Sequence, residues 1–299
     1  EISNVHKLPK VNLSHLIRLT DNFGIIQFAN KHIPDLNSGY TVDDNARALI
    51  ACTLHYNFFR EYKTLQLMKI YLDYIKYVQN KEGKFYNIVD KTKKIDYSHW
   101  SDDAHGRVVW ALGFFLKNQL VPEDFKIEAK KLLEKSIPVA LNLQSPRAIS
   151  FSLIGLCYAH QLGYDNENSI KKLADWLVSL YQSNSTKDWK WFEHYLTYSN
   201  SKLSESLLLA YAITHNKLYL KVAESSLRFL IKETYDRSMY IPVGQKGWYV
   251  KGQEKSYYDQ QPIEASYMIQ TLLTAYNITG NEYYKTKTID TFQWFLGKN

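Results

Sequence analysis

Two kinds of helical segment alternate along this chain, and this alternation limits its possible folds more than any other feature. The first kind is apolar on nearly all sides and follows a polar or acidic stretch, at residues 43–59, 102–116, 146–162, 200–215 and 260–276. The second kind is amphipathic with Lys and Glu on one face, at residues 65–80, 127–143, 169–183, 219–234 and 283–297. A helix that is apolar all round packs in an interior, whereas an amphipathic helix belongs to an outer layer.

Strict alternation of inner and outer helices predicts an array of helical hairpins. The inner segments start about every 45 to 60 residues, and residues 11–20 add a further helix that is expected to close a ring by packing beside the last one. The hairpins differ in length and their connections are elaborate, which favours a closed ring over a regular solenoid. Strand patterns are weak, and no linker rich in Pro, Gly or Ser divides the chain. We therefore predict an all-α fold, an α/α toroid of about six helical hairpins, as a single domain over residues 1–299.

Composition excludes several classes of protein. No apolar run approaches 18 residues, so no membrane span is expected. The first ten residues contain no apolar leader-like region, which leaves the compartment open between cytoplasm and periplasm. The net charge of +7 comes from scattered lysines such as Lys130 and Lys131 and forms no dense basic stripe. We therefore expect no nucleic-acid partner.

The cysteines and histidines do not predict a metal site or a cofactor. Cys52 and Cys157 both lie inside apolar helical segments, where a reduced thiol packs like a small hydrophobe. His99 and His105 flank an acidic pair, but no third ligand follows at a metal-binding spacing. No Gly-rich phosphate-binding loop is present either.

Three long connections, all from an outer helix to the next inner helix, are rich in aromatic and acidic residues. They cover residues 80–107, 183–206 and 236–265. In an α/α toroid all inner helices start at the same end. These connections are therefore expected to share one face of the ring with the starts of the inner helices.

An acidic pattern recurs where the inner helices start. The stretch YTVDDNAR (residues 40–47) is repeated as HWSDDAHGR (residues 99–107) and echoed by YYDQQPIEA (residues 257–265). One Asp at a helix start caps backbone N–H groups, but a pair exceeds that need. Adjacent residues at a helix start point about 100° apart. We therefore predict that Asp43 caps its helix and that Asp44 projects into a site.

These junctions carry a resemblance to a known family. The segments LTDNFGIIQFA, GYTVDDNARAL, SDDAHGRVVWALG, WFEHYLTYSNSKLSESLLLAY and YYDQQPIEASYMIQTLLTAY occur here in the order typical of a bacterial α/α-toroid family. That family belongs with the six-hairpin glycosidase-like proteins and occurs alone or fused to glycosyltransferases in polysaccharide loci. The resemblance runs from about Leu13 to the C-terminus. Phe28 replaces a common His and Ser204 a common Pro, but neither departure removes a carboxylate.

The resemblance implies a carbohydrate-active protein with an oligosaccharide or polysaccharide ligand and a glycosyltransferase as a partner. Glycoside hydrolysis needs two carboxyl groups on opposite sides of the bond to be cleaved. Glu193, enclosed by aromatic residues, suits the general acid, because apolar surroundings favour a protonated carboxyl group. Asp44 or Asp103 would be the base, kept ionised by Arg47 or Arg107. The catalytic candidates are Asp44, Asp103, Glu193, Asp102 and Asp259, and Glu264 is a further carboxylate on the same face.

Aromatic and amide side chains in the same connections are candidates for holding a sugar. The chain has 24 Tyr and 7 Trp, and packing does not require so many of them in loops. The substrate-binding candidates are Tyr40, Asp43, Arg47, Trp100, His105, Arg107, Trp189, Trp191, Tyr198, Trp248, Tyr258, Gln260 and Gln261. The competing structural interpretation makes the carboxylates helix caps, the arginines loop clamps and the aromatic residues core.

The sequence thus favours an inverting glycoside hydrolase that acts on an oligosaccharide or polysaccharide in the centre of the ring. A polysaccharide lyase or sugar epimerase is an alternative, with Tyr198, His99 or His105 as the base. A further alternative is a non-catalytic glycan-binding or scaffolding partner of a glycosyltransferase, in which the aromatic residues matter and the carboxylates do not.

Overall fold

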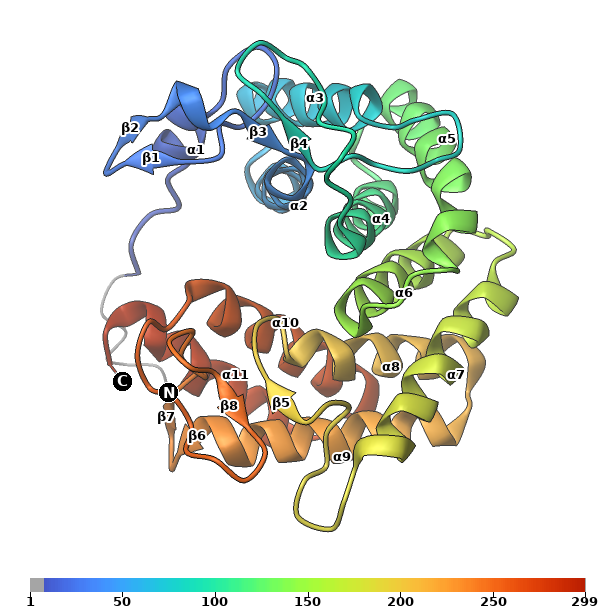
Figure 1. Ribbon diagram of the computed structural model, residues 1–299, viewed down its shortest axis with the longest axis vertical. Helices are drawn as coiled ribbons and strands as arrows, with labels where there is room; N and C mark the ends of the chain where they lie inside the picture. Colours follow the sequence, from blue (N-terminus) through green and yellow to red (C-terminus); the bar gives the residue numbers. More distant parts are fainter. Residues whose placement is uncertain (1–7, 299) are drawn as a thin grey trace.

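The computed structural model describes residues 8–298, which form helical hairpins arranged around a central axis (Figure 1). The inner helices are α2 (Val42–Phe59), α4 (Asp102–Lys117), α6 (Pro146–His160), α8 (Ser201–Thr214) and α10 (Pro262–Thr279). The outer helices are α3 (Tyr62–Tyr77), α5 (Glu123–Ala140), α7 (Glu167–Asn184), α9 (Lys217–Thr234) and α11 (Glu282–Phe292). This arrangement confirms the predicted all-α class and the α/α toroid. Across residues 8–298, no helix has the length and apolar character that crossing a membrane requires.

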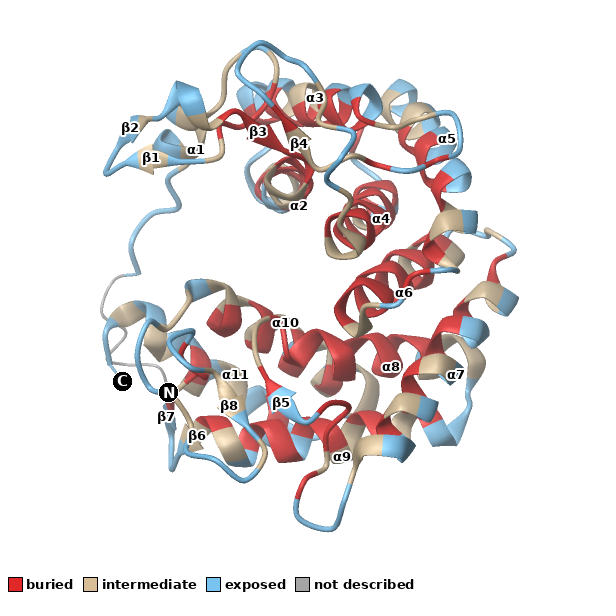
Figure 2. Ribbon diagram, viewed as in Figure 1, coloured by how far each residue is buried: buried red, intermediate tan, exposed pale blue. Residues whose placement is uncertain are grey.

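Burial separates the two layers as the alternation predicts. The inner helices are buried on nearly all sides, whereas the outer helices expose the face that points away from the ring (Figure 2). Helix α9 shows the second pattern, with Tyr219, Val222 and Leu230 buried while Lys217 and Lys221 are exposed. The apolar face of each outer helix therefore covers the inner ring.

Hydroxyl side chains start three of the inner helices. Thr41 caps α2 by accepting a hydrogen bond from the backbone N–H of Asp44 (3.2 Å), and Ser101 and Ser145 cap α4 and α6 in the same way. The prediction that Asp43 caps α2 is therefore wrong. Thr41 and Asp44 match the Ser/Thr-x-x-Asp/Glu pattern of a capping box, a signal that the acidic pair obscured.

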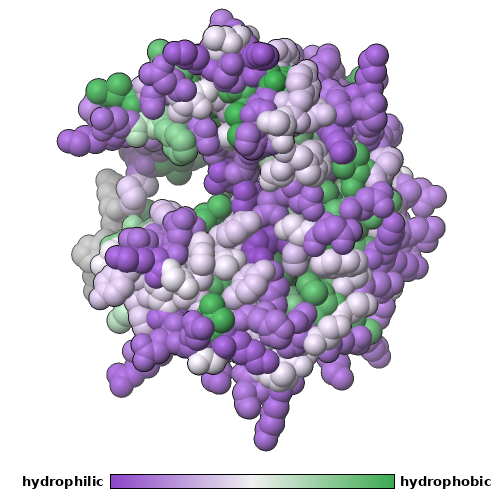
Figure 3. All heavy atoms as spheres, viewed as in Figure 1, coloured by the Kyte–Doolittle hydropathy of each residue, from purple (hydrophilic) through white to green (hydrophobic). Residues whose placement is uncertain are grey.

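The ring is open between α10 and α2. The principal contacts between inner helices run from α2 through α4, α6 and α8 to α10. The short helix α1 (Ser14–Leu19) packs against the first hairpin, where the Thr20 hydroxyl contacts the Tyr71 hydroxyl at 2.7 Å. The prediction that this segment closes the ring beside the last helix is wrong, because six residues are too short to fill a hairpin's place. Figure 3 shows the opening as a notch in one side of the molecule.

Short antiparallel ribbons tie the connections together. They pair β1 (Ala29–Asn30) with β2 (Ile33–Pro34), β3 (Tyr40–Thr41) with β4 (Ile88–Val89), β5 (Tyr195–Leu196) with β8 (Tyr249–Val250), and β6 (Tyr235–Asp236) with β7 (Met239–Tyr240). Single 3₁₀ turns, η1 (Leu36–Ser38) and η2 (Gln293–Leu296), complete the described elements. The β5–β8 pair matters most, because it joins two long connections that are separate in the sequence.

Helices α4 and α6 lie so close together that only glycine fits at their points of contact. A Cβ atom added to Gly113 would lie 2.1 Å from the carbonyl oxygen of Gly155. One added to Gly155 would lie 2.3 Å from the carbonyl oxygen of Val109, and one on Gly106 2.4 Å from that of Ala148. The two backbones are thus in direct contact, which brings the starts of both helices close together at the site face.

We predict that Gly155→Ala lowers the free energy of unfolding by about 1 to 3 kcal/mol, because the new methyl group forces α4 and α6 apart. In an unconstrained helix the same change would stabilise the protein by up to about 1 kcal/mol. The sign of the change in a urea melt therefore decides between close packing and simple helix propensity. A more stable variant would contradict the observed contact.

Candidate functional site

A cleft opens where the inner helices start, as the positions of the long connections predict. Its volume is about 610 Å³, and its walls come from α2, α4, α10 and the connections that carry β5 and β8. The residues that line it are Arg47, Ser101, Asp103, Arg107, Tyr198, Gln245, Trp248, Gln261, Pro262 and Ile263. The structure therefore brings together Arg47, Asp103, Arg107, Tyr198, Trp248 and Gln261 from the residues predicted for the site.

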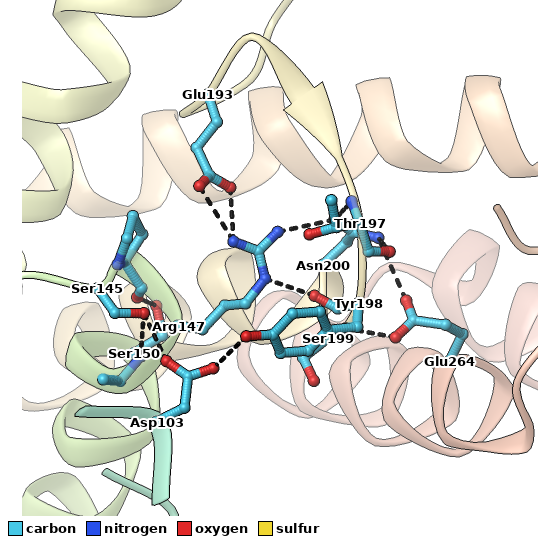
Figure 4. A network of polar contacts seen from close by, with 12 residues as sticks. Asp103, Ser145, Arg147, Ser150, Glu193, Thr197, Tyr198, Ser199, Asn200 and Glu264 are labelled. Atoms are coloured by element: carbon cyan, nitrogen blue, oxygen red, sulfur yellow. Dashed lines mark hydrogen bonds and ion pairs between the residues drawn. The ribbon is translucent and has the colours of Figure 1, made fainter. Parts of the chain in front are cut away.

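Asp103 is the carboxylate that lines this cleft. One of its oxygens accepts a hydrogen bond from the hydroxyl of Ser145 (2.5 Å), and the other accepts one from the hydroxyl of Tyr198 (2.6 Å) (Figure 4). Ser145 caps α6 and Tyr198 lies just before α8, so two further hairpins orient a carboxylate of α4. Both bonds fix the orientation of the Asp103 carboxyl group.

Two guanidinium groups separate Asp103 from the acidic pair of α2. Arg107, one turn after Asp103, reaches across to Asp43 (2.7 Å), and Arg47 contacts Asp43 (3.0 Å) and Asp44 (2.6 Å). Burial raises the pKa of Asp44, although the Thr41 hydroxyl and the charge of Arg47 oppose that rise. Asp43 therefore bridges α2 and α4, while Asp44 pairs with Arg47 of its own helix.

Aromatic side chains fill the ring axis beneath the cleft. The guanidinium of Arg107 lies 4.9 Å from the ring centre of Phe151, which stacks on Trp110 at 5.6 Å. The ammonium of Lys202 lies 4.4 Å from the Trp110 ring and is paired with Glu205 at 2.6 Å. Aromatic rings and charged groups thus lie beneath the cleft.

Arg147 holds one wall of the cleft from behind. Its guanidinium donates to both carboxylate oxygens of Glu193 (3.1 and 2.8 Å) and to the backbone carbonyl of Tyr198 (2.6 Å) (Figure 4). The same group lies 4.9 Å from the ring centre of Tyr198 and also donates to Asn200 at 3.4 Å. Arg147 and Glu193 are both buried. The pair therefore fixes the segment that presents Tyr198 to the cleft.

A second buried carboxylate, Glu264 in the first turn of α10, anchors the other end of that segment. It accepts hydrogen bonds from the backbone N–H of Ser199 and from the side-chain amide of Asn200 (3.2 Å) (Figure 4). Burial raises the pKa of Glu264 to about 7, with the bonds from Ser199 and the charge of Arg147 opposing the rise.

Several predicted site residues lie in the core instead. Trp191 is fully buried against Phe192 and Phe229, and Trp189 is buried with its indole N–H donating to the carbonyl of Glu193 (2.7 Å). Tyr40 is buried and donates to Asp21 (2.6 Å). The prediction that these rings stack on a sugar is corrected, because each is needed to pack a connection against the helices beneath it.

His105 is also away from the cleft. It is fully buried against Phe85 and Trp100, and burial lowers its pKa to about 4 despite a weak bond to the carbonyl of Ser136. The imidazole is therefore neutral at pH 7. It packs α4 against α5 rather than facing a ligand.

The remaining candidates hold connections or face solvent. Asp102 accepts from the indole N–H of Trp100 (2.8 Å) and from the backbone N–H groups of Gln144 and Ser145, so it supports the turn into α6. Tyr258 and Asp259 are exposed, and Gln260 accepts from the indole of Trp294. None of these residues lines the cleft.

Sequence reasoning missed Ser145, Arg147 and Gln245. Ser145 and Pro146 form a common start signal for a helix, which places Arg147 in the first turn of an inner helix on the site face. The sequence therefore predicts where Arg147 lies. It does not predict that Arg147 pairs with Glu193 in a distant connection. Across residues 8–298 no cluster of three or more His, Cys, Asp or Glu side chains could hold a metal ion.

Comparisons with known proteins identify the fold. No protein-family profile matches this sequence, and no curated protein matches it either. Among solved structures, cellobiose 2-epimerase from Bacillus thermoamylovorans superimposes with a TM-score of 0.72 at 13% identity, over 94% of this chain and 83% of that one. A D-mannose isomerase gives 0.67 at 13% identity, over 95% and 83%. A GH76 α-mannanase from Bacteroides thetaiotaomicron gives 0.56 at 12% identity, over 84% and 73%.

These similarities establish the class of protein that the fold defines. The chain has an α/α-toroid fold, as the sequence resemblance implied. At 12 to 13% identity, the comparison concerns the fold alone.

We predict that Glu193→Gln lowers the free energy of unfolding by about 3 kcal/mol, because it leaves the buried charge of Arg147 without its counter-ion. Chemical unfolding of the variant and of an exposed control, Glu82→Gln, measures the difference. If Glu193→Gln keeps full stability and loses only activity, Glu193 is the general acid that its aromatic surroundings predicted.

We predict that Glu264 makes the folded protein less stable as the pH rises from about 4.5 to about 7. The folded state retains a proton that the unfolded chain releases near its ordinary pKa, so its advantage is complete at low pH and disappears above pH 7. At about 1.4 kcal/mol per pKa unit, the full effect is on the order of 3 kcal/mol.

Unfolding of the wild type and Glu264→Gln at pH 4 and pH 8 tests this prediction. Loss of the Asn200 bond changes the free energy of unfolding of the variant by the same amount at every pH. The test is therefore whether the difference in free energy of unfolding between wild type and variant changes from pH 4 to pH 8. Parallel pH profiles would contradict a protonated Glu264.

Proposed function

We propose that this protein is a carbohydrate-processing enzyme that acts in the cleft around Asp103, as a glycoside hydrolase. The observation that carries the proposal is the position of Asp103 in the cleft wall, held by Ser145 and Tyr198 and separated by guanidinium groups from the acidic pair of α2. Likeness in fold to sugar epimerases, an isomerase and an α-mannanase supports a carbohydrate substrate.

The two kinds of carboxyl group suit the two roles in hydrolysis. Asp103, with two hydroxyl donors, is the base that would activate water. Asp44 is not among the residues that line the cleft, but it is paired with Arg47, which is (2.6 Å); burial raises its pKa, and it is our candidate for the group that protonates the leaving oxygen. Arg107 and Arg47 lie between the two carboxyl groups and keep them from direct contact.

Flat and amide side chains in the cleft suit a sugar. The rings of Tyr198 and Trp248 lie 6.3 Å apart, and both line the cleft. Gln245 and Gln261 are hydrogen-bonded to each other at 2.8 Å and keep further donors and acceptors for sugar hydroxyl groups. The β5–β8 ribbon brings Tyr198 and Trp248 to the same wall. We propose these residues, with Arg47 and Arg107, as the substrate-binding group.

Proton abstraction from a sugar carbon has less support from the same geometry. Burial and the neighbouring Asp103 both raise the pKa of Tyr198, so its hydroxyl stays protonated and donates to that carboxylate. His99 is exposed and bonded to Asp96, and His105 is buried. No described histidine is among the residues that line the cleft. Of the three bases predicted for a lyase or epimerase, only Tyr198 is therefore in the cleft, and its raised pKa makes it a poor base.

Epimerisation or isomerisation of a sugar is the second candidate, because the likeness to cellobiose 2-epimerase and D-mannose isomerase is stronger than that to the mannanase. In that case Asp103 would shuttle a proton through Tyr198. The two candidates differ in product. Hydrolysis creates new reducing ends, whereas epimerisation inverts one carbon of an intact sugar.

We predict that Asp103→Asn lowers the rate of glycan conversion by about 100-fold or more, because general-base catalysis contributes at least that factor. A panel of oligosaccharides followed by NMR of the products measures both the rate and the reaction. Asp236→Asn, which changes an exposed carboxylate far along the sequence, is the matched control.

An inverting hydrolase releases product with the opposite anomeric configuration in the first minutes. If the products are intact oligosaccharides with one inverted carbon, the reaction is epimerisation and not hydrolysis. Binding of a glycan by Asp103→Asn and wild type alike, without conversion by either, would contradict an enzyme.

A further inference from the structure

The outer wall of the ring carries a second hollow that is unrelated to the cleft. It has a volume of about 680 Å³ and lies along α9, between that helix and the connection after α7. Six cationic side chains line it: Lys187, Lys190, Lys217, Lys221, Arg228 and Lys232. We call this surface the basic groove. It shares no lining residue with the cleft, and Figure 3 shows hydrophilic side chains gathered along this lower edge of the molecule.

Most of the positive charge in the basic groove is not neutralised by the protein. Only two acidic side chains, Asp188 and Glu224, line it, and Glu224 contacts Arg228 at 3.5 Å. Four of the lysines that line the groove are Lys187, Lys190, Lys217 and Lys221. Within residues 8–298, no carboxylate oxygen lies within 4.0 Å of their ammonium groups. A concave surface of one charge sign concentrates ligands of the opposite sign.

The shape of the groove fits an extended ligand. Lys217, Lys221, Arg228 and Lys232 follow one another along α9, and a rise of about 1.5 Å per residue spreads them over roughly 22 Å. Lys187 and Lys190 form the facing wall. A smaller hollow of about 240 Å³ that shares Lys190 and Lys221 continues the surface past the connection.

The floor of the groove is apolar. It is formed by Leu220, Phe229 and Tyr211, beneath the cationic side chains. The pyranose ring of an acidic sugar has an apolar face and a charged substituent at its edge, which matches an apolar floor with cationic walls. Lysines outnumber arginines in the groove. Because the lysine ammonium is a compact point charge, it suits single carboxylate or phosphate groups spaced along a chain.

We propose that the basic groove binds a polysaccharide that carries carboxylate or phosphate groups. The groove holds such a polymer on the outer wall of the ring while the cleft acts on it, so this inference rests on the proposed function and narrows its substrate to an anionic glycan.

Binding of polygalacturonate to the full chain tests the proposal, with the fully methyl-esterified polymer as the uncharged counterpart. We expect polygalacturonate to bind and its ester not to bind. Lys217→Glu combined with Lys221→Glu should weaken binding at least about tenfold and lower its dependence on salt. Lys131→Glu combined with Lys135→Glu on α5 has the same spacing and the same change in net charge, and should leave binding unchanged.

Any of four results would overturn the inference: no binding of polygalacturonate, equal binding of the methyl ester, equal loss in both double variants, or equally tight binding of single-stranded DNA with the same sensitivity to the α9 variant. Asp103→Asn should bind polygalacturonate like the wild type, which separates the groove from the cleft. Conversion of a neutral glycan without binding of polygalacturonate refutes the groove and leaves the proposed function standing. Groove binding without conversion of any glycan supports the groove as a binding site and refutes the enzyme.

Discussion

A buried guanidinium, that of Arg147, holds the site together. Only 4% of this side chain is exposed, so its charge must be matched inside the protein. Glu193 matches the charge, and the carbonyl of Tyr198 and the amide of Asn200 take the remaining donors. Because these partners lie in the connection before α8, satisfying one arginine of α6 fixes where that connection lies, and with it the wall of the cleft.

Other polar contacts around the ring likewise tie the helix starts to the connections. Glu264 of α10 holds the backbone at Ser199, Asp103 of α4 holds Tyr198, and Arg107 of α4 holds Asp43 of α2. Each contact joins the start of one inner helix to another or to a connection. The ring is open between α10 and α2 (Figure 1). The polar contacts at the helix starts link the other hairpins, which contact one another.

This arrangement bears on both candidate reactions. In the proposed hydrolysis, a carboxylate with two hydroxyl donors and a second carboxyl group of raised pKa would serve as base and acid without a histidine. The fold is shared with enzymes of both kinds, and fold alone does not select a chemistry. The basic groove adds a different property, a cationic surface on the outer wall. The outer helices do not pack against the inner ring on that side.

The sequence by itself determined the layers and the face that carries the site. Apolar and amphipathic helices must lie inside and outside, and the acidic junctions had to gather where the inner helices start. It also named Arg47, Asp103, Arg107, Tyr198, Trp248 and Gln261, because charged and aromatic residues at these junctions have few other uses.

Only the tertiary structure decided which of these side chains face the cleft. Trp189, Trp191 and Tyr40 turn inward because their connections need apolar anchors, and Glu193 is taken by Arg147, a residue 46 positions away. The roles expected for Asp43 and Asp44 changed because Thr41 satisfies the helix start and Arg107 attracts Asp43 from another helix. Such choices depend on partners that are distant in the sequence, and local pattern carries no information about those partners.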